Sequence, residues 1–262
     1  MPRPEPDHDY LAGPHPRAYA HRGWHIGDLE GMENSLSAFR RAFDEGFRYL
    51  ETDVHATSDG VVVVQHDPGL DRTTDSNGLV ARMSWSAVAK AKIGGREPVC
   101  RLTDLLEELP DALINIDVKA NSAVQPLADV LRRTKAFGRV CLASFSDARL
   151  QRMRRICGPE LLTSMGPRAA ATLWAFGRLH APRSWSSVRG RLAQVPPRQG
   201  ALTVVDGRLI VAAHRRGIEV HVWTIDEPAQ MTELLDLGVD GLVTDRPDLL
   251  RDVLRQRGQW PG

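Results

Sequence analysis

The chain lacks several features that would place it in a common class at once. Its 34 basic and 33 acidic side chains leave a formal net charge of +1, whereas proteins that bind nucleic acid in bulk usually have strongly basic surfaces. No stretch approaches the roughly 18 consecutive apolar residues of a membrane-spanning helix. The polar N-terminus, which begins Met1-Pro-Arg-Pro, has no apolar signal-peptide core. We therefore expect a soluble, cytoplasmic protein that acts on a small molecule and binds no nucleic acid.

Several catalytic motifs are missing as well. The three cysteines, Cys100, Cys141 and Cys157, have no CxxC spacing, so they are expected to be reduced and mostly buried. No Gly-x-Ser-x-Gly sequence occurs, and Gly23 and Gly27 do not start a GxGxxG loop after a strand. These absences argue against a covalent serine mechanism and against a dinucleotide-binding domain.

What the chain does have is a regular alternation of short apolar strands and helical patterns. With 262 residues, of which 42% are apolar, it can build one large α/β domain. Asn34 or Ser35 caps the first helical pattern and Gly46 ends it. Strands that are each followed by a helix are expected at residues 18–21, 47–54, 113–118, 140–143, 161–163, 201–205, 219–224 and 241–243.

Eight such units predict a (β/α)8 TIM barrel, because parallel strands with right-handed crossovers close into a barrel of this size. Residues 61–65 follow the Asp59-Gly60 turn and are expected to be an extra hairpin partner. A polar, irregular insertion spans about residues 67–98. The predicted organisation is a flexible segment at 1–16 and one barrel domain at 17–258. An open, doubly wound sheet is the alternative, which the missing glycine-rich loop disfavours.

Acidic side chains lie at the carboxyl ends of two neighbouring barrel strands. Glu51 and Asp53 are two residues apart on one strand, so they project to the same side. Two close carboxylates repel each other unless a cation or a proton lies between them, and Mg²⁺, Ca²⁺ and Mn²⁺ accept oxygen ligands. With Asp117 as a third ligand, the pattern predicts a site for one divalent cation. Two solvated surface acids would explain the Glu51–Asp53 pair alone equally well.

Five more side chains are expected at the same mouth of the barrel: His21 and Arg22 after the first strand, His66 after the hairpin, Lys119 beside Asp117, and Trp223 late in the seventh strand. The two histidines suit proton transfer near neutral pH. Arg22 and Lys119 can donate to phosphate oxygens, and Trp223 is a candidate substrate contact. Lys119 could instead form a structural ion pair with Asp117, and Trp223 could belong to the core. The complete set favours phosphate ester chemistry.

The motifs that carry this chemistry occur in a recognisable order: His21-Arg-Gly23, Glu33-Asn-Ser35, Glu51-Thr-Asp-Val54, His66-Asp67, Asn115-Ile-Asp-Val-Lys119, Val222-Trp-Thr224 and Gly238-Val-Asp-Gly-Leu-Val-Thr-Asp-Arg-Pro247. From about residue 18 to residue 257 the chain resembles the glycerophosphodiester phosphodiesterase family. The resemblance implies a TIM barrel with an insertion after the second strand. It also implies hydrolysis of a glycerophosphodiester to glycerol 3-phosphate and an alcohol with the help of a divalent cation.

By position, the resemblance assigns Glu51 and Asp53 to the metal and His21 and His66 to acid and base catalysis. Arg22 and Lys119 correspond to phosphate contacts. A glycerol hydroxyl is the expected internal nucleophile, which benefits from a high effective molarity. The family commonly has Glu where this chain has Asp117, so the third carboxylate arm is one methylene shorter.

Three alternatives concern the substrate and the activity. Between Glu160 and Asp206 there is no acidic residue but six arginines, with Trp174 and Trp185 among them. Such a basic stretch, at residues 168–198, suits peripheral contact with anionic lipid and a lysophospholipase D activity; a solvated helix face is the simpler explanation. A catalytically silent phosphodiester-binding barrel and a cyclising lyase use much the same residues. The oligomeric state is left open.

Overall fold

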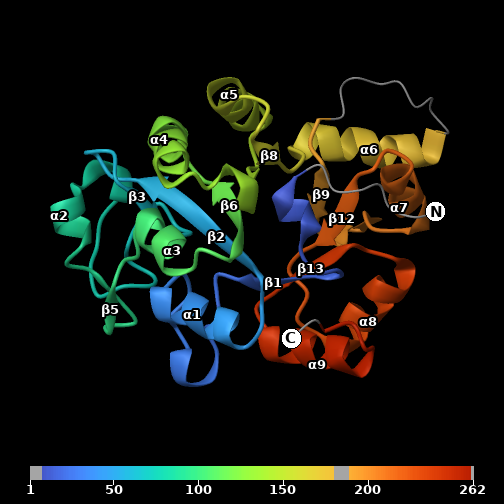
Figure 1. Ribbon diagram of the computed structural model, residues 1–262, viewed down its shortest axis with the longest axis horizontal. Helices are drawn as coiled ribbons and strands as arrows, with labels where there is room; N and C mark the ends of the chain where they lie inside the picture. The colour runs from blue at the N-terminus through green and yellow to red at the C-terminus, as the bar shows by residue number, and fades with distance from the viewer. Residues whose placement is uncertain (1–7, 180–188, 261–262) are drawn as a thin grey trace.

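Eight parallel strands form the centre of the molecule (Figure 1) in the computed structural model, which describes residues 8–179 and 189–260. They are β1 (Arg17–His21), β2 (Tyr49–Ala56), β6 (Leu113–Val118), β7 (Val140–Ala143), β8 (Leu162–Thr163), β9 (Leu192–Val195), β12 (Glu219–Val222) and β13 (Gly241–Thr244). Neighbours pair in the order β8-β7-β6-β2-β1-β13-β12-β9. A backbone bridge between Ser164 and Leu192 joins the two ends of this sheet. The predicted (β/α)8 barrel is confirmed.

Helices surround the strands (Figure 1). They are α1 (Leu36–Asp44), α3 (Leu102–Glu108), α4 (Val124–Thr134), α5 (Asp147–Cys157), α6 (Pro167–Leu179), α7 (Gly207–His214), α8 (Pro228–Leu237) and α9 (Pro247–Gln256). Local chemistry marks their ends. Ser35 caps α1 by accepting a hydrogen bond from the Ala38 amide at 3.1 Å, and Gly238 ends α8 with a φ of +97°.

The sixth barrel strand differs from the prediction. Residues 192–195 fill that place as β9, whereas the expected strand at 201–205 was wrong. There the chain instead forms a small antiparallel hairpin of β10 (Arg198–Gln199) and β11 (Leu202–Thr203). The apolar run was misleading because Leu202 and Thr203 are exposed, while Leu192, Ala193 and Val195 are buried. A barrel strand must be buried on both faces, and only β9 meets that condition.

The predicted hairpin partner and insertion lie to one side of the barrel, at the left of Figure 1. β3 (Val62–Val64) pairs antiparallel with β2. The insertion contains α2 (Trp85–Val88), β4 (Lys92–Ile93) and β5 (Glu97–Pro98). It also contains one turn of 3-10 helix, η3 (Val80–Arg82). The other 3-10 turns in the described residues lie outside the insertion: η1 (Asp9–Ala12), η2 (Gly27–Leu29), η4 (Asn121–Ala123) and η5 (Phe137–Arg139). Leu70, Val80 and Ile93 pack with Met32 and Val63 in a second, smaller core, which anchors the insertion beside the barrel.

The opposite end of the barrel is closed by the segment that was expected to be flexible. Tyr10 is fully buried there, and its hydroxyl donates to the Tyr19 hydroxyl at 3.1 Å. Arg17 donates to both carboxylate oxygens of Glu219, at 2.5 and 2.6 Å. From residue 8 onward this segment is therefore part of the fold. Among the described residues, no helix is long and apolar enough to cross a membrane.

The Arg17–Glu219 pair gives a prediction about acid stability. Burial raises the pKa of Glu219, but Arg17 and His221 outweigh it, so the pKa is lowered overall. Because the folded-state pKa of Glu219 lies below the unfolded value of roughly 4.3, the ionised side chain stabilises the fold above that pH. This contribution to stability is lost as the pH falls through the folded-state pKa. Replacing Glu219 with Gln is expected to cost about 3–5 kcal/mol at pH 7, because Arg17 remains buried without a counter-charge.

Urea unfolding at a series of pH values measures both effects. The loss of stability below pH ~4.3 is expected to be shallower in Glu219→Gln than in the unmodified chain. The exposed Glu233→Gln serves as the control. Parallel pH profiles for Glu219→Gln and the unmodified chain would contradict the assignment.

Candidate active site

All eight predicted site residues line one cavity of about 620 Å³ at the carboxyl ends of the barrel strands. They are His21, Arg22, Glu51, Asp53, His66, Asp117, Lys119 and Trp223. Register explains how distant segments meet. His21 of β1 lies beside Glu51 of β2, and Asp53 of β2 lies beside Asp117 of β6. Parallel strands that end at one level bring their last side chains to one mouth.

Lys119 lies between two of the predicted metal ligands. Its ammonium group is 2.8 Å from Asp53 Oδ1 and 2.8 Å from Asp117 Oδ2. Burial alone lowers the pKa of Lys119, but the two carboxylates raise it overall, so the side chain stays charged. The ion pair considered for Asp117 and Lys119 is thus present, and Asp53 takes part in it. The ammonium group also lies at the cavity wall, where it can reach a phosphate oxygen.

Two carboxylate oxygens in the same cluster have no hydrogen-bond partner. Glu51 Oε2 and Asp117 Oδ1 are buried and make no hydrogen bond. Burial, together with the nearby Asp53 charge, raises the pKa of Glu51 to about 8. Buried carboxylates without partners are unfavourable unless a proton or a cation compensates them. Among the described residues, no three His, Cys, Asp or Glu side chains already form a complete metal cluster, yet the free oxygen donors suit a hard divalent cation.

Arg22 reaches the acidic cluster from a strained backbone. Its φ is +56°, in the left-handed region, where a non-glycine residue is uncommon. The Arg22 amide donates to the Glu51 carbonyl at 2.9 Å, and its Nε lies 3.2 Å from Asp53 Oδ2. Gly23 follows at a φ of +88°, where an added Cβ would lie 2.8 Å from the Ala38 backbone. The close approach to α1 therefore requires glycine and directs Arg22 into the cavity.

His21 is held in one orientation by an acid that sequence reasoning did not single out. Its Nδ1 donates to Asp245 Oδ1 at 2.7 Å, because a carboxylate can only accept. His25 contacts the same oxygen at 3.1 Å. The other ring nitrogen of His21 faces Glu51 Oε2 at 3.6 Å. Burial lowers the pKa of His21, but Glu51 and Asp245 raise it overall.

His66 is oriented by a chain of charged groups that runs through the insertion and back to Arg22. Its Nδ1 lies 2.6 Å from Asp67 Oδ1, and Arg72 donates to Asp67 Oδ2 at 2.6 Å. Arg72 also binds both oxygens of Glu33 at 2.7 Å, and Glu33 in turn accepts from Arg22 at 3.1 Å. The hydrogen bond from Arg72 lowers the pKa of Asp67 to about 2. The network joins the insertion to both predicted catalytic segments.

Asp245, His25, Arg72 and Asp67 thus support the site, although sequence reasoning gave them no role. A signal was available for Asp67 and Asp245, because each stands inside a quoted motif. Arg72 and His25 stand in no quoted motif, and the contacts of Arg72 with Glu33 and of His25 with Asp245 join residues distant in sequence. Contacts across the barrel mouth were needed to find them.

Trp223 lies at the barrel mouth as expected, whereas Trp174 of the basic stretch lies in different surroundings from those considered. Trp223 stacks edge-on against Phe145, with 5.6 Å between ring centroids, and both line the cavity. Trp174 also lines the cavity, and its indole donates to the Thr203 carbonyl at 3.3 Å. Trp185 of the predicted membrane-facing stretch lies outside the described residues. Trp174 is therefore part of the cavity wall.

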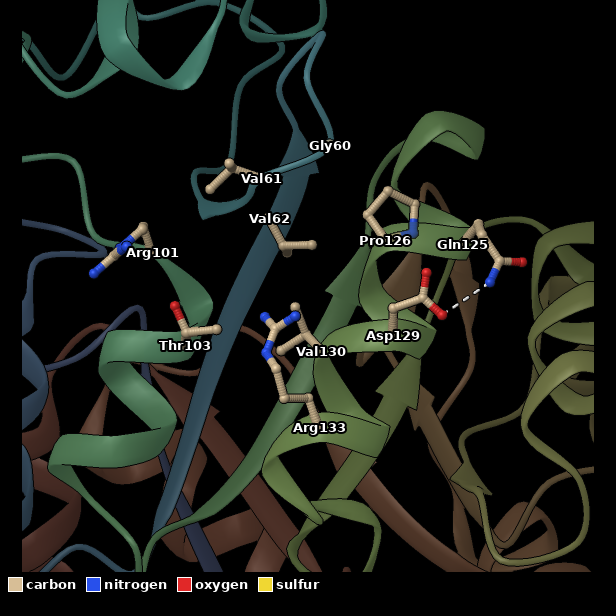
Figure 2. A pocket seen from close by; sticks show the side chains of 10 residues that line it. All are labelled: Gly60, Val61, Val62, Arg101, Thr103, Gln125, Pro126, Asp129, Val130 and Arg133. Carbon is tan, nitrogen blue, oxygen red and sulfur yellow. Dashed lines mark hydrogen bonds between the residues drawn. The ribbon is translucent and has the colours of Figure 1, made fainter.

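Figure 2 shows a second cavity, of about 410 Å³, between the β2–β3 hairpin and helices α3 and α4. No histidine is among the residues that line it. Its one acidic side chain, Asp129, accepts a hydrogen bond from Gln125 at 3.0 Å. With neither a proton-transfer pair nor a cluster of acids, this outer cavity has none of the chemistry of the barrel mouth.

Comparisons with known proteins match the whole barrel. The model of the glycerophosphoryl diester phosphodiesterase family matches residues 17–249. A Mycobacterium tuberculosis protein named "Probable glycerophosphodiester phosphodiesterase 2" is 42% identical over 248 residues, 94% of this chain and 93% of the relative. A Mus musculus protein named lysophospholipase D is 27% identical, over 91% of this chain and 86% of the relative. The crystal structure of a glycerophosphodiester phosphodiesterase from Agrobacterium tumefaciens has a TM-score of 0.72 and 27% identity, covering 91% of this chain and 99% of the other.

Proposed function

The chain belongs to the glycerophosphoryl diester phosphodiesterase family and is a phosphoric diester hydrolase, and we propose that His21 and His66 catalyse metal-dependent hydrolysis of glycerophosphodiesters at the barrel mouth. The product is glycerol 3-phosphate, together with the released alcohol. One observation carries the proposal: both histidines line the same cavity as Glu51, Asp53 and Lys119. A protein that only binds phosphodiesters needs the charges but has no use for two oriented proton-transfer groups.

The proposed reaction has two steps. In the first, one histidine takes the proton of a glycerol hydroxyl, whose oxygen attacks phosphorus, while the other protonates the leaving alcohol. The resulting cyclic phosphate is opened by water with the histidine roles reversed, which yields glycerol 3-phosphate. Asp245 and Asp67 hold the two rings in place through their Nδ1 atoms. Arg22 and Lys119 stabilise the negative charge that builds on the non-bridging oxygens.

Enzymes of this family generally depend on a divalent cation. We assign Glu51, Asp53 and the Oδ1 atom of Asp117 to it, because Glu51 and Asp117 each have a buried oxygen with no hydrogen-bond partner. A bound Mg²⁺, Ca²⁺ or Mn²⁺ would neutralise phosphate oxygens as charge develops. Every proton transfer remains with the protein's own histidines.

Removing the cation is expected to abolish hydrolysis, and adding it back is expected to restore activity. Dialysis against EDTA followed by titration with each ion measures this directly. Binding is also expected to raise the Tm of the unmodified chain, and to do so less in Glu51→Gln, which lacks one charged ligand. Full activity after chelation would contradict metal dependence.

The proposed function is tested by the release of glycerol 3-phosphate from a panel of glycerophosphodiesters with each cation. Glycerophosphocholine and glycerophosphoethanolamine are suitable first substrates. Absence of release from every member, under all three cations and with a folded protein, would overturn the proposal. Accumulation of a cyclic phosphate without glycerol 3-phosphate would identify the cyclising lyase instead.

A further inference from the structure

The cavity at the barrel mouth is divided into a charged half and an apolar half. The charged half comes from the ends of β1, β2 and β6 and from His66. The other half lies over the ends of β7, β8 and β9, where α6 and the β10–β11 hairpin form its wall. We call this half the apolar chamber and define it by Phe145, Met165, Ala170, Trp174, Val195 and Leu202. The steps of the proposed reaction use none of these side chains.

The wall of the apolar chamber is held in place by interactions outside it. The Trp174 indole is fixed by its hydrogen bond to Thr203, and the Arg178 guanidinium lies 3.5 Å from the centre of its ring. Arg178 is itself held by Asp206 at 2.7 Å. A large aromatic side chain that is fixed on one side while the other lines a cavity is suited to ligand contact.

Two side chains at the rim of the apolar chamber are unusually exposed. Phe145 is 66% exposed and Leu202 is 47% exposed. Both line the cavity, so a ligand that fills it would shield them from water. Exposed apolar side chains that gather at a concave site mark a binding surface. Phe145 also connects the two halves, because the Lys119 ammonium lies 5.8 Å from its ring centre. A ligand that places its phosphate at Lys119 therefore reaches the chamber directly.

We propose that the apolar chamber binds an alkyl or acyl chain carried by the glycerophosphodiester substrate, an inference that rests on the proposed function of the site. A small, polar alcohol would gain nothing from this wall, whereas each buried methylene is removed from water. This hydrocarbon chain can belong to either of the two alcohols that the phosphodiester joins. It is an acyl group on the glycerol in a lysophospholipid, or the alcohol itself in a glycerophosphoalkanol.

Hydrolysis of two homologous series tests the proposal and distinguishes the two sources. One series is 1-acyl-lysophosphocholine and the other glycerophospho-n-alkanol, each with chains of increasing length, kept below the concentration at which they form micelles. In the series that fits, kcat/KM is expected to rise by roughly three- to fourfold per methylene until the chamber is full. If kcat/KM is independent of chain length in both series, the proposal is overturned while the proposed function stands.

Variants connect the chain-length effect to this wall. In Leu202→Ala, the ratio of kcat/KM for a long chain to that for the shortest chain is expected to fall about tenfold. Leu237→Ala is the matched control, since Leu237 is 40% exposed on α8 and does not line the cavity. This control variant is expected to have the same ratio of kcat/KM values as the unmodified protein. If the ratio of kcat/KM is the same in Leu202→Ala and Leu237→Ala, the hydrocarbon chain of the substrate does not lie against this wall.

A binding measurement separates the failure of this inference from the failure of the proposed function. Calorimetry on His66→Ala with the same two series reports Kd without turnover. If the unmodified chain hydrolyses no diester, the proposed function fails, and the calorimetric series still decides on the apolar chamber. A Kd that decreases with chain length supports it, and a Kd that does not change with chain length overturns it.

Discussion

Replacing either His21 or His66 with alanine is expected to lower kcat by about 10²–10⁴-fold, the usual contribution of a positioned acid or base. Each ring lies in the cavity and is oriented by a carboxylate at its Nδ1, Asp245 for His21 and Asp67 for His66. The other nitrogen of His21 lies 3.6 Å from Glu51 Oε2, beyond hydrogen-bond distance, so in the proposed mechanism it can still exchange a proton with the substrate. The measurement is the release of glycerol 3-phosphate under saturating substrate and cation.

His214→Ala is the matched control for these variants. His214 also pairs with an acid, since its Nε2 lies 2.8 Å from Asp240, but it does not line the cavity. It is expected to keep the unmodified kcat. Thermal unfolding of all three variants shows whether any loss of activity comes from a loss of fold. Undiminished hydrolysis in folded His21→Ala and His66→Ala would rule out the histidine mechanism.

Replacing Lys119 with methionine is expected to lower kcat/KM by about 10²–10³-fold, comparable to the loss of one charged donor at a transition state. Lys119 is the cation between Asp53 and Asp117, and it lies at the cavity wall. Without it, the two carboxylates face each other across strands β2 and β6 with less compensation. The pKa of Asp53, which Lys119 and Arg22 lower against the effect of burial, is then expected to rise.

Kinetics and carboxyl titration by NMR check both expectations for Lys119→Met. The variant Lys119→Arg keeps the charge but changes its shape, so it is expected to recover part of the activity. The exposed Lys92→Met, in the insertion, is the control for loss of a positive charge. Activity equal to that of the unmodified chain in Lys119→Met would show that this lysine is only a structural ion-pair partner.

Much of the fold could be predicted because strand and helix periodicity is a local property. The barrel, most of its strands, and the hairpin partner at β3 followed from apolar runs, turn residues and helix caps. The sixth strand could not be predicted in the same way. Residues 201–205 have a stronger apolar pattern than 192–195, and only the closure of the sheet at Ser164 and Leu192 decides between them. Closure depends on residues distant in sequence, which a local pattern does not contain.

The candidate site shows the same division. Alternation along a strand placed Glu51 and Asp53 on one side, and the strand-end rule brought all eight predicted residues to one mouth. The sequence alone therefore determined that these eight side chains share one cavity, and their catalytic roles stay a prediction. Only the tertiary structure decided their partners: Lys119 between Asp53 and Asp117, and Arg72 between Asp67 and Glu33. The apolar chamber, too, could be recognised only in the tertiary structure. Its walls come from α6, β9 and the β10–β11 hairpin, and apolar side chains from separate elements form a surface only after the chain has folded.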